Sequence, residues 1–171
     1  LMELITMAAH KKGYQIQQSE LHGLAQRGGA IQAHLRIGKQ VYSPLIEPGQ
    51  VDLIISMDLL EAFNACAYAN PKKTQVLSST EIFWSGSNSP DQKKTLEKIT
   101  NLVKLVKTVP SDEITEKQTK TKVFANVFLF AYAVKEKFLP FDKKLAWQVV
   151  QEKLKGKMLK ENKKVFQAAF E

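Results

Sequence analysis

Hydrophobic residues recur along this chain at two different periods, and these periods predict an alternation of helices and strands. Apolar residues at positions 1, 5, 8 and 9 follow the helical period and predict a first helix that ends by residue 13. Residues 14–18 alternate with the period of a strand, and residues 30–37 do so more cleanly. The inner face of this second strand is expected to carry Ile31, Ala33, Leu35 and Ile37, and its polar face Gln32, His34 and Arg36.

The middle of the chain continues the alternation of elements. Residues 51–56 form a nearly continuous apolar run, which is typical of a strand buried on both faces. A helical pattern follows and ends near Asn70 and Pro71, and residues 74–79 predict another strand. Strands that alternate with helices in this way indicate a layered α/β domain.

Helical patterns dominate the second half of the chain. Ser89, Pro90 and Gln92 match a capping box with proline at the first helical position, so a helix is expected to start there. A short strand is predicted over residues 107–109, while the polar residues 110–121 predict no clear element. Apolar residues at 123, 127, 130, 134 and 138 predict a long, mostly buried helix, and Asp142 is expected to cap the next one.

These elements together predict the fold class. We expect one α/β domain over residues 1–171, a three-layer sandwich with a Rossmann-like mixed central sheet and a helical C-terminal portion. The first predicted helix begins at residue 1 without a preceding strand or a cap. The chain is therefore expected to open inside the fold, with an upstream element absent.

Composition excludes several classes of protein. Hydrophobic residues make up 44% and charged residues 25% of the chain, which is typical of a globular domain. The single cysteine, Cys66, cannot form an internal disulfide, a four-cysteine zinc site or a complete set of iron–sulfur ligands. The longest apolar stretch, residues 123–134, is too short to span a bilayer, and no signal-peptide pattern is visible. We expect a cytoplasmic protein without a membrane partner.

The net charge of +8 arises entirely in the second half of the chain. Residues 1–89 hold seven basic and seven acidic side chains, whereas residues 90–171 hold eighteen lysines and ten acids. Solvated helix faces are the simplest interpretation of these lysines. A nucleic-acid surface is disfavoured because the lysines are not interleaved with arginine and aromatic residues. A surface for an acidic partner stays an alternative.

Residues 19–29 fit neither period and concentrate chemically versatile groups. This loop holds three of the eight glycines, and its side chains include Glu20, His22, Gln26 and Arg27. Glycines allow close approach of a ligand, and an arginine beside backbone N–H groups makes an anion site. Arg27, Gly28 and Gly29 therefore suit a phosphate, a carboxylate or an acidic residue of a partner. The alternative is a tight surface loop with Arg27 in solvent.

The other polar candidates favour contact over catalysis. His22 lies in a glycine-bounded loop, where a hydrogen-bonding or interface role is more common than acid–base catalysis. Glu20 is expected to accept hydrogen bonds from nearby N–H groups or from Arg27. His34 and Arg36 share one strand face, which favours an interface or sheet-covering role. No metal site is predicted because no further ligands occur at suitable spacing, and we assign no catalytic residue.

The loop and the segments after it resemble a known family. Residues 20–29 read Glu-Leu-His-Gly-Leu-Ala-Gln-Arg-Gly-Gly, and the strand His-Leu-Arg-Ile-Gly at 34–38 and the segment Tyr-Ser-Pro-Leu-Ile at 42–46 follow. These motifs resemble the gamma-type domain of 2-oxoacid:ferredoxin oxidoreductases. The form of the loop is most similar to the small (beta) subunit of the indolepyruvate branch. That family opens with a strand and a glycine-rich loop, so the resemblance implies that both are missing from this chain.

The resemblance implies a division of labour between subunits. Thiamine diphosphate, magnesium and iron–sulfur clusters would belong to a large partner subunit, and this chain alone would bind no cofactor and show no activity. The implied reaction is oxidative decarboxylation of an arylpyruvate to an aryl-acyl-CoA, with coenzyme A as co-substrate and ferredoxin as electron acceptor. Arg27, Gly28 and Gly29 would contact an anion or the coenzyme A side. The implied interface residues are Glu20, His22, Gln26, His34 and Arg36.

Two other functions stay open from the sequence. One is the same chemistry with another 2-oxoacid, such as pyruvate, a branched-chain oxoacid or 2-oxoglutarate, because the partner's thiamine pocket would read the substrate. The other is a stand-alone phosphate- or nucleotide-binding module, or a weak nucleic-acid binder that uses the basic half. The latter predicts a stable monomer that binds polyanions in a salt-sensitive way.

Overall fold

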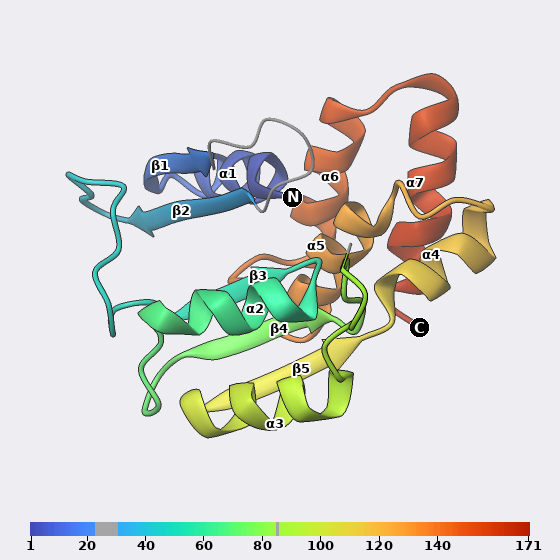
Figure 1. Cartoon of the computed structure of the whole chain (residues 1–171). Coiled ribbons are helices and arrows are strands. Elements are labelled where there is room, and N and C mark those ends of the chain that lie inside the picture. Colours follow the sequence, from blue (N-terminus) through green and yellow to red (C-terminus); the bar gives the residue numbers. More distant parts are fainter. Residues whose placement is uncertain (23–30, 85) are drawn as a thin grey trace.

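The computed structural model of the chain describes residues 1–22, 31–84 and 86–171 and has the expected α/β class (Figure 1). Strands and helices alternate through the first two thirds, and helices alone form the last third. In chain order the elements are α1 (Met2–Lys11), β1 (Gln15–His22), β2 (Ile31–Gly38), β3 (Leu53–Ser56), α2 (Leu59–Ala65), the 3-10 turn η1 (Cys66–Tyr68), β4 (Gln75–Ser79), α3 (Gln92–Leu102), β5 (Leu105–Val109), α4 (Ser111–Thr119), α5 (Ala125–Lys135), α6 (Lys143–Lys153) and α7 (Gly156–Ala168).

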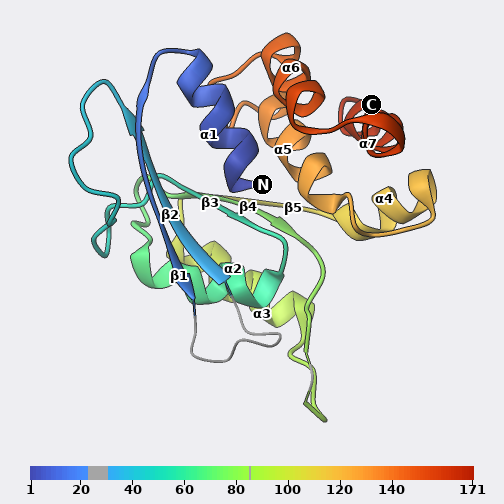
Figure 2. The same cartoon turned by 90° about the horizontal axis from the view of Figure 1, so that it is seen from above.

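The strands of the described residues form two sheets. β3, β4 and β5 lie side by side in sequence order and pair in parallel, while β1 and β2 form an antiparallel hairpin. Parallel and antiparallel pairing are therefore both present, as the sequence predicted, but each occurs in its own sheet. Figure 2 shows the reason, because the hairpin crosses the direction in which β3–β5 run and so does not extend their hydrogen-bond ladder.

Helices cover both faces of the parallel sheet and complete the three layers. α2 and α3 lie against one face, and α5 lies against the other, where α1 and α6 also pack (Figures 1 and 2). The main core surrounds α5, which buries eight of its eleven residues, among them Phe128, Leu129 and Phe130. An all-round apolar helix is expected at such a central position, and each fully buried side chain of this size contributes about 1.5–3 kcal/mol.

Helix boundaries differ from the sequence expectations at three places. α3 begins at Gln92, and its N-cap is Asp91, whose carboxylate accepts from the Lys94 N–H at 2.8 Å; the expected cap at Ser89 is therefore wrong. The polar residues 110–121 contain α4. Its polar and apolar residues separate only weakly onto two faces, so the sequence pattern did not predict this helix. Val123 precedes α5 and is 70% exposed, so it does not belong to the buried stripe. Asp142 caps α6, as expected, and accepts from the Leu145 N–H at 2.8 Å.

Candidate functional site

The β1–β2 hairpin carries the polar residues singled out by the sequence. Its register places Ser19 opposite His34 and Gln17 opposite Arg36, and it places Glu20 opposite Ala33. Directly opposed residues project to the same side of an antiparallel pair, and side chains alternate along each strand. His34 and Arg36 therefore share a face, as predicted, while Glu20 belongs to the other face.

His34 is buried and connects the hairpin to its surroundings. Its side chain is 6% exposed, its Nδ1 accepts from the Ile46 N–H at 3.1 Å, and its Nε2 lies 3.2 Å from the amide nitrogen of Gln32. The ring also meets Tyr68 edge-on, with 5.0 Å between the ring centroids. The Nδ1 lone pair is thus occupied and the ring is buried against Tyr68, so the geometry favours the sheet-covering role for His34 over acid–base or metal chemistry.

Arg36 lies on the surface beside exposed apolar side chains. Its Nη1 donates to the carbonyl oxygen of Ser43 at 3.3 Å, which holds the guanidinium against the segment that follows β2. Tyr42 and Leu45 in that segment are 85% and 56% exposed. An arginine beside an exposed aromatic and an exposed aliphatic side chain matches the composition of protein interfaces. We call Arg36, Tyr42 and Leu45 the hairpin patch.

The apolar face of β2 enters the core only over its second half. Leu35 and Ile37 pack against the main core together with Ile16 of β1, as the alternation predicted. Ile31 is 71% exposed and Ala33 is also exposed, so the prediction of an inner position is wrong for these two residues. The start of β2 therefore offers further apolar surface on the side opposite to Arg36.

The strongest sequence candidates fall within or next to residues 23–30. Gln26, Arg27, Gly28 and Gly29 fall outside the described residues, and so does the side chain of His22. The backbone of His22 pairs with Ile31, so this pair marks the end of the hairpin that residues 23–30 connect. The roles predicted for these side chains stay predictions.

A second polar constellation, which the sequence analysis missed, is built around Asp58. Its carboxylate is buried at the end of β3, where Oδ1 accepts from the N–H groups of Leu60 at 2.7 Å and Glu61 at 3.0 Å. Oδ2 accepts from the Phe83 N–H at 2.6 Å, in the segment after β4. One carboxylate thus caps α2 and also fixes the loop that carries exposed Phe83 and Trp84. An aspartate directly before a helix, two residues after a strand, was the available signal.

Buried hydroxyls and a carboxyl group join the ends of β4 and β5. The Ser111 hydroxyl donates to Ser79 Oγ at 2.9 Å, and Asp112 beside it is 3% exposed. Burial raises the pKa of the Asp112 carboxyl and is the largest influence on it; Lys122 and the Ser111 hydroxyl act in the opposite direction, and Glu116 raises it further. Ligands of α/β proteins bind at this edge of the sheet, but these groups are inside it and support its structure.

Among the described residues, neither a metal-ligand cluster nor a membrane-spanning helix is found. No group of three or more histidine, cysteine, aspartate or glutamate side chains in them could hold a metal ion. Cys66 belongs to the core between α2 and the sheet, and burial raises the pKa of its thiol to about 11. In the part of the chain that the structure describes, every helix is too short or too polar to cross a membrane.

Comparison with known proteins finds similarity along the whole length of the chain. The model of the family described as pyruvate ferredoxin/flavodoxin oxidoreductase matches residues 1–171. Indolepyruvate oxidoreductase subunit IorB of Archaeoglobus fulgidus is 27% identical over 98% of this chain and 85% of its own length. The IorB subunit of Methanothermobacter thermautotrophicus is 35% identical over a shorter region, 46% of this chain and 40% of its own.

Solved structures share the fold at low sequence identity. The gamma subunit of a keto/oxoacid ferredoxin oxidoreductase from Geobacter sulfurreducens has a TM-score of 0.64 at 17% identity, over 98% of this chain and 86% of its own. Pyruvate oxidoreductase subunit PORC from Thermotoga maritima has a TM-score of 0.66 at 15% identity, over 98% and 85%. In 2-oxoglutarate:ferredoxin oxidoreductase from Magnetococcus marinus, the matching part is 27% of a longer chain, with a TM-score of 0.66.

Proposed function

Because the chain belongs to the pyruvate ferredoxin/flavodoxin oxidoreductase family, we propose that it is the small subunit of an indolepyruvate:ferredoxin oxidoreductase. The observation that carries the proposal is the likeness to an IorB subunit over 98% of the chain. The loop at residues 20–29, which resembles the same branch of the family, is in keeping with that likeness. The proposed location is the cytoplasm.

The proposed reaction is the oxidative decarboxylation of an arylpyruvate. The bond between the carbonyl carbon and the carboxylate breaks and releases carbon dioxide, and the acyl carbon forms a thioester with coenzyme A. The electron pair passes to ferredoxin and the thiol proton is released. Thiamine diphosphate, magnesium and iron–sulfur clusters supply this chemistry from a large partner subunit. Cys66 is the only cysteine and it is buried in the core, so it is not a cluster ligand.

This chain's own contribution to the complex is contact and positioning. The proposed interface with the large subunit comprises the hairpin patch, Glu20 on the other face of the hairpin, and the sequence candidates His22 and Gln26. His34 supports that surface from beneath, because its ring holds Ile46 and Tyr68 against β2. Arg27, together with the backbone of Gly28 and Gly29, is the proposed contact for a carboxylate or for a phosphate of coenzyme A.

Another 2-oxoacid is the second candidate substrate. The names of the solved neighbours favour it, because they include a pyruvate oxidoreductase subunit and a 2-oxoglutarate enzyme that has the same fold over 98% of this chain. The purified complex should be given arylpyruvate, pyruvate and 2-oxoglutarate in parallel with coenzyme A. Faster ferredoxin reduction with arylpyruvate supports our proposal. A clear preference for pyruvate or 2-oxoglutarate would contradict it and identify that 2-oxoacid as the substrate.

Purification of the native complex tests the proposal directly. The tagged chain is captured from its own cells, and the captured material is analysed by mass spectrometry, visible absorbance and thiamine assay. We expect a brown large subunit with bound thiamine diphosphate. A colourless chain that elutes alone, or one that carries nucleic acid, would refute the assignment.

Substitutions on the hairpin separate its proposed roles. Replacing Arg36 and Tyr42 together by alanine should reduce capture of the large subunit, while the exposed Lys94→Ala on α3 serves as the control. Arg27→Ala should weaken assembly or raise the concentration of coenzyme A needed for turnover. If Arg27→Ala leaves both unchanged, Arg27 has no part in the function.

A further inference from the structure

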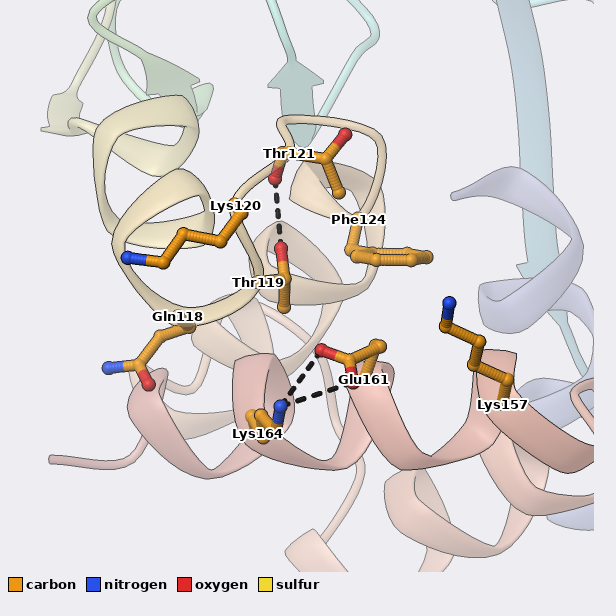
Figure 3. Close-up of a pocket in the computed structure, with 8 residues that line it drawn as sticks. All are labelled: Gln118, Thr119, Lys120, Thr121, Phe124, Lys157, Glu161 and Lys164. Atoms are coloured by element: carbon orange, nitrogen blue, oxygen red, sulfur yellow. Dashed lines mark hydrogen bonds and ion pairs between the residues drawn. The ribbon is translucent and has the colours of Figure 1, made fainter.

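A groove of about 540 Å³ lies between α7 and the turn that joins α4 to α5 (Figure 3). Its charged lining consists of Lys120 from the end of α4 and of Lys157, Glu161 and Lys164 from α7. Phe124, which is 8% exposed, contributes an aromatic wall beside these groups. We call this the lysine groove. It lies in the helical portion of the chain, apart from the hairpin patch, and nothing proposed above uses it.

Two of the three lysines in the groove have no acidic partner. Lys164 forms an ion pair with Glu161 at 3.0 Å, so these two charges compensate each other. Among the residues that the structure describes, neither Lys120 nor Lys157 takes part in an ion pair. Figure 3 shows them at opposite ends of the groove, with the Lys157 side chain rising from α7 on the side of Phe124 and the Lys120 side chain extending from the end of α4. The groove therefore carries excess positive charge that is distributed along it.

The backbone of Lys120 has an unusual conformation for a lysine, which bears on how this residue is best substituted. This residue caps the C-terminus of α4 with φ 64° and ψ 16°, a left-handed conformation in which glycine is strongly favoured. A lysine is strained there, but Lys137 after α5 also has a positive φ outside the groove, so the backbone alone assigns no use to the side chain. Compensation of the helix dipole does not require it, because Lys117 already lies in the last turn of α4.

Apolar surface accompanies the unpaired charges. Val123 precedes Phe124 in the sequence and is 70% exposed, and Met158 follows Lys157 and is 47% exposed. Both are large, exposed hydrophobic side chains that adjoin lining residues in the sequence. An occupant of the groove would thus meet apolar contacts between positive charges.

We propose that the lysine groove docks an acidic segment of a protein partner. The carboxylates of the segment would pair with Lys120 and Lys157, and an apolar side chain between them would cover Phe124 and its exposed neighbours. A single phosphate fits less well, because Lys120 and Lys157 lie at opposite ends of the groove and Lys157 lies seven residues, or about 10 Å of helix rise, from Lys164. The inference does not depend on the identity of the enzyme.

Peptide binding by the full chain tests this assignment. The probe is a dye-labelled peptide in which one leucine is flanked on each side by glutamates, and fluorescence anisotropy reports its binding. Because each lysine supplies one solvent-exposed charge, we expect Lys120→Gly and Lys157→Gln each to weaken binding by about threefold or more. The matched control is Lys163→Gln, which removes an exposed lysine of α7 outside the groove and should leave affinity unchanged.

Further measurements exclude trivial explanations. Lys120→Gly replaces a strained lysine by the favoured residue, so its melting temperature should stay the same or rise while its affinity falls. A glycine in place of the peptide's leucine should also weaken binding. Absence of peptide binding, or an equal loss in Lys163→Gln, would overturn the proposal. Displacement of the peptide by inorganic phosphate or by a DNA oligonucleotide at lower concentration than by unlabelled peptide would also overturn it, because the groove would then serve a different ligand.

Discussion

Removal of the Asp58 carboxylate is the most informative perturbation of the fold near the candidate site. Its Oδ1 caps α2 through Leu60 and Glu61, and its Oδ2 holds the Phe83 N–H of the loop after β4. Asp58→Ala removes the acceptor of all three donors. Asp58→Asn retains one oxygen for the cap, but its amide nitrogen cannot accept from the Phe83 N–H.

The expected loss follows from these three contacts. An N-cap is worth about 0.5–2 kcal/mol, and a hydrogen bond to a charged group about 1.5–3 kcal/mol. We therefore expect Asp58→Ala to lower the free energy of unfolding by about 2–4 kcal/mol and Asp58→Asn by about half of that. In a domain of this size each kcal/mol lowers Tm by about 2–4 °C. The control is Asp142→Ala, which removes one exposed cap bond and should cost about 1 kcal/mol.

Urea denaturation followed by circular dichroism measures these losses. Trp84 adjoins Phe83, so its fluorescence reports the local effect in a Trp147→Phe background, in which it is the remaining tryptophan. We expect Asp58→Ala to shift that emission to longer wavelength before global unfolding. If Asp58→Ala costs no more than Asp142→Ala and leaves the emission unchanged, the carboxylate does not connect the two segments and the reasoning is refuted.

Three further predictions concern the core, the thiol and a buried acid. Leu129→Ala should lower the free energy of unfolding by about 2–5 kcal/mol in urea titrations, because Leu129 is fully buried, whereas Val123→Ala should change it by less than about 0.5 kcal/mol. Cys66 should react with a thiol reagent at pH 8 about a hundredfold more slowly than an ordinary thiol, because its pKa is raised from 9.0 to about 11. Unfolding in urea should restore the normal rate, and a fast reaction in the folded protein would contradict the burial of Cys66. The raised pKa of Asp112 means that the folded state binds this proton more tightly than the unfolded state does, so ionisation of Asp112 weakens the fold as pH rises through the folded pKa. Asp112→Asn should therefore gain stability relative to the parent between pH 4 and 7. A stability difference that is independent of pH would contradict this.

Local patterns predicted the elements better than the contacts between them. The alternation in residues 30–37 predicted β2 and the shared face of His34 and Arg36, because that signal depends on the strand alone. It could not predict that Ile46 and Tyr68 cover His34, nor that Ile31 lies outside the core, because both depend on segments distant in the sequence. The contacts that build the candidate sites likewise depend on segments that are distant in the sequence.

The groups that connect different parts of the fold illustrate the limit. Asp58 and Phe83 meet across 25 positions of sequence, and Ser79 and Ser111 across 32. No periodicity records such pairs, because they arise only when parallel strands bring their carboxyl ends together. The lysine groove was likewise present in the sequence only as a surplus of lysines, which solvated helices alone would explain.

The central claim is that this chain works as the small subunit of a larger oxidoreductase. Capture of the tagged chain from its own cells, followed by an arylpyruvate- and coenzyme A-dependent assay of ferredoxin reduction, tests that claim most directly. We predict a brown complex with a large thiamine diphosphate-containing subunit that reduces ferredoxin, and the same activity should be absent from the chain alone. A colourless, partnerless chain, or a complex without 2-oxoacid-dependent ferredoxin reduction, would contradict the account.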